Sequence, residues 1–427
     1  LGIGTVGIGI AATVADIGGT TSATLSDSVL NITNATKVIG ESDATIKTLA
    51  VGGAGGAGAV AGSSSTNLID NDIRAGISNV GTDPAKDGSG EARPGVVLSQ
   101  NVTTIAANNN ARIDSLAGAA GYGGNAAGAA IAVNRIATTN QAYFSGGSDQ
   151  RGYRVRQLTV DAGSTGSAAG QSSGQGGEAN INTIAVGAAM SSGMTLAGSL
   201  AVNIMSGGND ARIDKDANVI ADGSIGVFAG NHQGINVLAG AASLRGSAGV
   251  GIGVVVNDVQ TDTTAGIYGS KVTAYGNDVV PGGAGMPDEG GLMVDSGTAK
   301  NASILDDQMK VGEAEQARDD LANPSDYTSP DLSSEQLRVH GLAVNANNQQ
   351  HIAPMGDTVA IGAIVGVNRI GGKTEATIDG SAINLGNYGS TDISSGSGTN
   401  TASGFHGQTP NQQVDVRAGS RQFAVNW

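Results

Sequence analysis

The sequence of 427 residues contains no cysteine, only eight prolines and 3% aromatic residues. The absence of cysteine excludes disulfide bonds, zinc–thiolate sites and thiol nucleophiles. The shortage of aromatic side chains excludes a compact core of ordinary large residues, so the interior must be thin and finely packed. We therefore expect one elongated body instead of two or three compact domains.

Basic residues and long apolar runs are also scarce. The chain has 22 Lys and Arg against 37 Asp and Glu, a formal net charge of −15, and no basic cluster interleaved with aromatics. This composition argues against a nucleic-acid partner. No apolar run reaches the roughly 20 residues of a membrane-spanning helix. The four histidines, His232, His340, His351 and His406, show no metal-ligand spacing.

Glycine is abundant, with 70 copies. A chain rich in Gly, Ser, Asn and Ala is compatible with disorder. However, Thr5–Ile10, Val250–Val256 and Val359–Val367 alternate small with β-branched residues at period two, which is typical of strands and not of helices. The periodicity therefore favours an ordered all-β protein.

A repeated spacing organises the chain. Five times an asparagine is followed eight residues later by alanine and ten residues later by a bulky apolar residue; the asparagines are Asn67, Asn134, Asn203, Asn257 and Asn368. An earlier copy has Ala15 in the asparagine position. A second pattern, apolar-x-x-apolar-Ala, precedes each asparagine, as at Ile46 and Leu49. Self-similarity with variable insertions between copies is typical of stacked repeat units.

These repeats predict a right-handed parallel β-solenoid, or β-helix, of about six sequence repeats with one large insertion outside the solenoid. If one coil takes about 25 residues, each short repeat holds about two coils. In the repeat that begins at Ile181 we expect strands near 181–190, 196–205, 211–214, 217–221 and 224–229. Val202 and Val254 are expected in the buried stack.

The predicted organisation has three parts. Residues 1–278 form solenoid repeats, 279–338 form an acidic insertion that holds half of the prolines, and 339–427 continue the solenoid. Within the insertion, 303–321 has a helix-compatible composition. The polar stretches 78–94 and 163–180 are expected to project as loops. Both ends resemble cuts within a longer repeat array, because 423–426 has the pattern of another anchor.

The repeated asparagines allow two interpretations. They could form a row of ligand-binding amides, or they could form a structural corner of the repeat. We favour the corner, either capped or laddered, because stacked equivalent turns place the same side chain above itself and asparagine can bond neighbouring backbone or adopt a left-handed turn.

The sequence requires no cofactor or metal. An incidental Ca²⁺ site could involve Gly207–Asp210, the pair Asp70 and Asp72, or the pair Asp306 and Asp307, because carboxylates are hard ligands. The adjacent acids Asp306–Asp307 and Asp319–Asp320 lie in the insertion and not on a repeated strand, so they do not form a general acid and base held in a groove. We predict that the protein is not an enzyme. The alternative is a β-helix that binds or degrades polysaccharide.

The stretch Leu196–Gly240, with its AVN, A-x-I and INVLA motifs, resembles the repeats of large bacterial surface exoproteins of the filamentous-haemagglutinin and leukotoxin-like adhesin family. The resemblance covers most of 1–278 and 339–427 but not the insertion. It implies a non-catalytic shaft of a secreted or cell-surface adhesin or extracellular matrix fibre. The partners expected of such a shaft are a host surface, a bacterial surface or a polysaccharide. End-to-end joining with further copies is expected separately, because an uncapped coil presents unpaired strand edges.

Overall fold

The computed structural model describes residues 2–26, 32, 34–79, 97–146, 153–163, 178–244, 248–276, 292–299, 334–354, 363–383 and 413–424. Within these ranges every regular element is a β-strand. All strand pairs but one are parallel, which agrees with the predicted all-β, parallel architecture. The predicted helix at 303–321, the insertion's acidic pairs and His406 lie outside the described residues.

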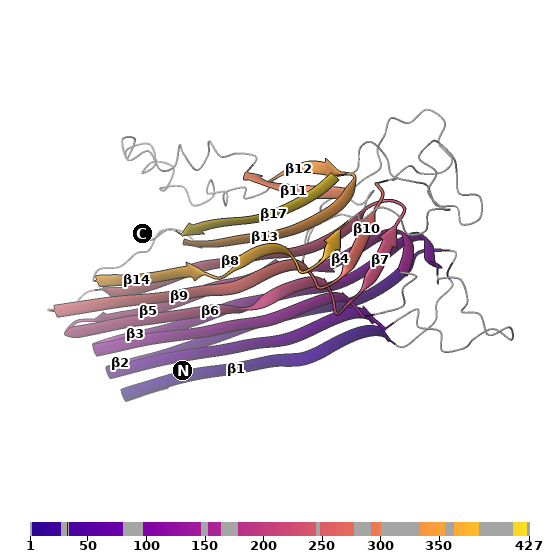
Figure 1. The fold of residues 1–427 in the computed structure, drawn as a ribbon. Coiled ribbons are helices and arrows are strands. Elements are labelled where there is room, and N and C mark those ends of the chain that lie inside the picture. The colour runs from indigo at the N-terminus through magenta and orange to yellow at the C-terminus, as the bar shows by residue number, and fades with distance from the viewer. Residues whose placement is uncertain are drawn as a thin grey trace, which may run out of the picture.

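The main sheet is built by successive passes of the chain that lie beside one another in register (Figure 1). One side of every pass, which we call layer A, carries the repeated asparagines. Layer A consists of β1 (Gly2–Ser26), the second half of β2 (Thr36–Ser78), the last third of β3 (Val97–Ser145), β6 (Met194–Asp214), β9 (Ala248–Tyr268), and β14 (Ala363–Gly371) with β15 (Thr374–Asp379).

The facing side, layer B, contains the first half of β2, the middle of β3, β5 (Glu178–Ser191) and the second half of β8 (Ile225–Leu244). Along the chain, a short strand follows a layer A strand and completes the pass. These short strands are β4 (Tyr153–Ala162), β7 (Asn218–Ala221), β10 (Lys271–Ala274) and β16 (Ala382–Ile383). Two further strands, β13 (Gly341–Pro354) and β17 (Gln413–Ala424), extend the sheet beyond β8.

Each sequence repeat forms one pass, and the prediction of two coils per short repeat is wrong. Gly2 pairs with Ala54, an offset of 52 residues, and Met194 pairs with Ala248, an offset of 54. The prediction failed because the layer strands are much longer than a 25-residue coil allows. Two strands predicted at 196–205 and 211–214 are one strand, β6, because the glycines at 207 and 208 do not end its ladder.

β2 bends back on itself between Gly52 and Gly62, whose backbones lie close together, and the interior is narrow on both sides of this bend. We call this part the narrow sector; it comprises 49–66 of β2 and the residues in register with them. Its buried core is a cluster of alanines from both layers: Ala54, Ala59, Ala61, Ala119, Ala126, Ala189, Ala197 and Ala241. A Cβ on Gly52 would overlap the carbonyl of Gly62, and one on Gly187 would overlap that of Gly198. The layers are therefore so close that these positions admit only glycine.

The interior widens away from that bend, in what we call the wide sector. Next to the alanines lies a cluster of isoleucines with Met205, and beyond it a cluster with Phe144, Tyr153 and Leu158. The rings of Phe144 and Tyr153 meet edge to face with centroids 4.8 Å apart, a favourable aromatic arrangement. Burial raises the pKa of Tyr153. In cross-section the stack is thus wedge-shaped.

Val202 and Val254 do not lie in the buried stack, which corrects the prediction. Successive side chains of a strand point to opposite faces. Because Asn203 and Ala201 point inward and are fully buried, Val202 points outward. Val254 pairs laterally with Leu200 on the same outer face. Both valines are partly exposed.

Of the predicted insertion at 279–338, the structure describes 292–299 and 334–338. Its described strands, β11 (Leu292–Ala299) and β12 (Ser334–Val339), form an antiparallel pair. Leu292 and Val339 are buried against Phe228 and Ala343 of the main sheet. The β11–β12 pair is therefore held against the main sheet by an apolar contact.

Candidate functional site

The repeated asparagines form a continuous hydrogen-bonded ladder through the interior. Each Nδ2 donates to the Oδ1 of the next pass: Asn67 to Asn134 at 2.7 Å, Asn134 to Asn203 at 2.9 Å, Asn203 to Asn257 at 2.9 Å, and Asn257 to Asn368 at 2.8 Å. The first four are buried and Asn368 is partly buried. None has a positive φ, and all five lie inside strands and not at a turn.

The ladder also joins the two layers. Thr183 of layer B donates to Asn203 Oδ1 at 2.6 Å and accepts from Asn134 Nδ2 at 2.8 Å. Ser65, two residues before Asn67, bonds Thr48 and Ser115 of layer B. The amides therefore form a polar seam at the boundary between the narrow and wide sectors. Because they are buried and bonded to one another, they offer no surface for a ligand.

The ladder stops at the first pass. Ala15 is the register partner of Asn67 and supplies no amide. Asn67 Oδ1 is buried without a hydrogen-bond partner. An unpartnered buried acceptor costs free energy, typically about 1–3 kcal/mol. The first pass therefore lacks the side-chain amide hydrogen bond that joins each later pass to its neighbour.

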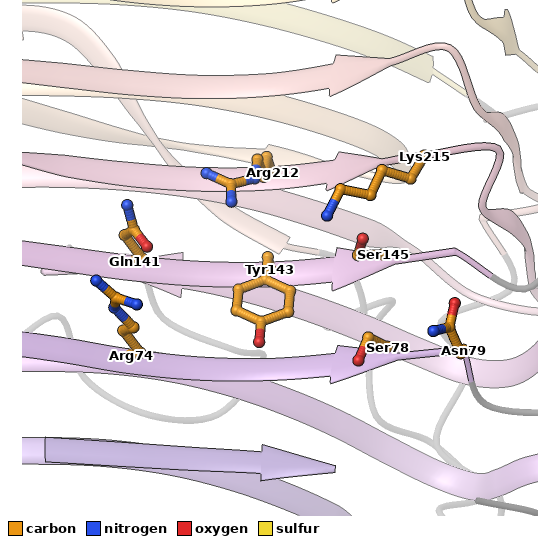
Figure 2. Close-up of a pocket in the computed structure, with 8 residues that line it drawn as sticks. All are labelled: Arg74, Ser78, Asn79, Gln141, Tyr143, Ser145, Arg212 and Lys215. Carbon is orange, nitrogen blue, oxygen red and sulfur yellow. The ribbon is translucent and has the colours of Figure 1, made fainter. Parts of the chain in front are cut away.

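A pocket of about 320 Å³ opens on the outer face of layer A in the wide sector. Its lining comes from β2, β3, β6 and the residues just after them: Arg74, Ser78, Asn79, Gln141, Tyr143, Ser145, Arg212 and Lys215. Figure 2 shows Tyr143 in the middle, with both arginines and Gln141 toward one end and Asn79 and Lys215 toward the other. Sequence reasoning missed this pocket, because its residues are separated by whole repeats.

Local backbone geometry shapes the pocket. Gly76, beside Tyr143 in the sheet, has no side chain, and a Cβ there would collide with the tyrosine ring. The ring therefore lies flat over the glycine and keeps its other face outward. Asn79 and Lys215 adopt left-handed conformations, with φ of 50° and 57°. They end their strands at the rim, which places Lys215 above the pocket.

The arginines of the pocket are held by neighbouring acids. Arg74 Nη2 lies 2.7 Å from Asp72 Oδ2, and Arg212 bonds both Asp210 and Asp214. The guanidinium of Arg212 also lies 5.7 Å from the centre of the Tyr143 ring. Burial raises the pKa of Asp210, and the charge of Arg212 lowers it in part. Ion pairs of this kind present rigid hydrogen-bond donors and acceptors to the pocket without a strong net electrostatic field.

The same contacts occupy residues that the sequence suggested for Ca²⁺. Asp72 pairs with Arg74, Asp210 pairs with Arg212, and Asn209 points inward and accepts from Asn140 Nδ2 at 2.6 Å. In the ranges that the structure describes, no group of three or more His, Asp or Glu side chains could hold a metal ion. The ring centroids of His232 and His351 lie 6.3 Å apart in an edge-to-face arrangement.

Comparisons with known proteins give no match: no family model, curated protein or solved structure is similar to this chain. Over the described part of the chain, no helix is both long and apolar enough to cross a membrane.

Proposed function

We propose that the chain is a segment of a right-handed β-solenoid shaft belonging to a secreted or cell-surface bacterial adhesin or matrix fibre. The observation that carries this proposal is the register: the same repeat positions are stacked pass upon pass, down to the asparagine ladder. Units that contact only their neighbours build long rods, and rods hold binding regions away from a surface.

The shaft acts through length, shape and repeated display instead of catalysis. Its stability comes from backbone ladders between passes and from close packing of small residues within them. The resemblance of Leu196–Gly240 to filamentous-haemagglutinin and leukotoxin-like repeats supports an extracellular or cell-surface location. The excess of acidic residues suits a surface protein that must stay soluble at high local density.

End-to-end joining follows from the open edges of the stack. Among the described residues β1 pairs only with β2, and β14 pairs only with β9. An open edge offers unpaired N–H and C=O groups to another strand. In a longer array, or between separate chains, these edges would continue the ladder.

Electron microscopy of the purified segment, with light scattering, tests end-to-end joining. We expect thin filaments whose length grows with protein concentration. Ala23→Lys places a cation on an inward position of β1, where a stacked copy would bury it, and should shorten the filaments. Ser22→Lys adds the same charge on the exposed outer face and should leave them unchanged. Particles of one size at every concentration would contradict the proposal.

The pocket around Tyr143 favours a second function, the binding of a sugar unit of a polysaccharide. A flat, outward aromatic ring suits the apolar face of a sugar, and Gln141, Ser145 and the arginine–aspartate pairs suit its hydroxyl groups. We expect oligosaccharide binding in calorimetric titrations that is lost in Tyr143→Ala. Tyr122→Ala, which removes an exposed tyrosine elsewhere on the sheet, is the control. Equal loss in both variants, or no binding across neutral and acidic oligosaccharides, would contradict this function.

A further inference from the structure

The outer face of layer A is apolar over most of the narrow sector. Large side chains point outward there: Ile8 is 61% exposed, Leu196 56% and Val250 52%, and the three lie in one lateral column. The next outward columns hold Ile10 and Ile252, then Ile131 and Val365, then Val14 and Val367, all at least 40% exposed. We call these four columns the apolar face.

The apolar face carries no charge. At the outward positions of these columns that the structure describes, only Ala, Gly, Ser, Thr, Val, Ile and Leu occur. The next outward column contains Asp16, Arg135, Asp258 and Arg369, so charges of both signs begin at its border. An apolar area with a polar border is typical of an interaction surface.

We propose that the apolar face binds the same face of a second copy of the chain, so that two shafts associate side by side. The dimensions suit this partner. Five strands with four outward positions each and β14 with three, at spacings of about 4.8 Å between strands and about 6.7 Å along them, give a flat area of roughly 700 Å². A standard stable interface buries about 800 Å² per partner. The area of one copy is thus close to the requirement.

Regularity favours a copy of the same chain over an unrelated protein. The columns repeat at the strand spacing, so ridges on one copy fit between ridges on another with the same spacing. Sheets pack face to face in this way when their inner faces are apolar. Because the mixed charges at the border have both signs, a two-fold arrangement could place opposite charges across the interface.

A lipid surface is the less suitable partner. The sheet has open edges at β1 and β14 among the described residues. Insertion of this sector into hydrocarbon would leave the backbone groups of those edges without hydrogen bonds, which lipid-exposed structures avoid. Association with a second sheet covers the apolar side chains and leaves the edges in water.

Analytical ultracentrifugation tests the proposal in an Ala23→Lys background, which suppresses end-to-end joining and keeps the two associations distinguishable. We expect a concentration-dependent dimer that sulfate strengthens, because sulfate favours apolar burial. Leu196→Lys should weaken dimerisation at least tenfold. Ser206→Lys, an outward change on the same strand beyond the apolar face, should leave the dimerisation constant unchanged.

If Leu196→Lys does not fold, a milder substitution and a cross-linking experiment test the same dimer. Val250→Thr keeps the side-chain shape and should also weaken the dimer. Because the chain has no cysteine, Leu200→Cys at the centre of the face should form a covalent dimer on oxidation, whereas Ser22→Cys should not. A monomer at every concentration would overturn the proposal. So would flotation of the protein with neutral phosphatidylcholine vesicles that Leu196→Lys abolishes, since it would identify lipid as the partner.

Discussion

The narrow and wide sectors have opposite arrangements of large and small residues. In the wide sector, Ile, Phe and Leu fill the interior, and Asp, Arg and polar residues cover the outer face of layer A. In the narrow sector, alanine and glycine fill the interior, and Val, Ile and Leu point outward. Hydrophobicity alone therefore does not identify the inner face of a strand. The distance between facing layers decides which residues fit inside.

The asparagine ladder marks the boundary between these sectors. On one side of it the layers are separated by alanine, serine or bare backbone, and on the other side by branched and aromatic side chains. An amide is intermediate in size and bonds the next pass and the opposite layer together. The ladder therefore fixes the register at the position where the thickness of the interior changes.

The largest expected difference in stability is between a substitution at an inward apolar residue of β6 and one at an outward apolar residue of the same strand. Ile213→Asp buries a charge in the wide interior, where Ile213 has no exposure, and should lower the free energy of unfolding by more than about 4 kcal/mol. Val202→Asp, on the outer face of the narrow sector, should cost about 1 kcal/mol or less. Urea denaturation at low protein concentration measures both. Similar losses would show that the outer face of the narrow sector is buried within one chain.

A smaller effect on stability is expected to distinguish two glycines that lie opposite each other in the two layers. Gly187→Ala brings a Cβ against the backbone of Gly198, and we expect a loss of about 1–3 kcal/mol in the free energy of unfolding. Gly198→Ala points outward, where the nearest atom to its Cβ would lie 4.0 Å away. That substitution should be neutral or stabilise by up to about 1 kcal/mol, because alanine is less flexible than glycine when unfolded. The reverse order in urea denaturation would contradict the close packing of the layers.

The smallest expected effect is a gain. Ala15→Asn would extend the ladder to the first pass and donate to the unpartnered Oδ1 of Asn67. We expect a stabilisation of about 1 kcal/mol, the usual net value of a hydrogen bond. Ala12→Asn, on the outer face of the same strand, has no such partner and serves as the control. Hydrogen exchange of β1 amides should slow in the first variant and not in the second.

The sequence by itself determined the all-β class and the register. The Asn, Ala and Ile columns predicted from spacing are the lateral columns of the sheet, for example Asn134 with Asn203 and Ala142 with Ala211. Spacing suffices here because in-register strands place equal positions side by side.

Only the tertiary structure decided the number of passes per repeat, the orientation of Val202 and Val254, and the pocket around Tyr143. A two-residue period defines two faces of a strand but not which one is covered. The covered face depends on how closely the opposite layer approaches, and at Gly187 and Gly198 that approach is set by residues of a different strand. The pocket likewise joins Arg74, Tyr143 and Arg212, which belong to three separate repeats. Such contacts exist only after the passes have stacked.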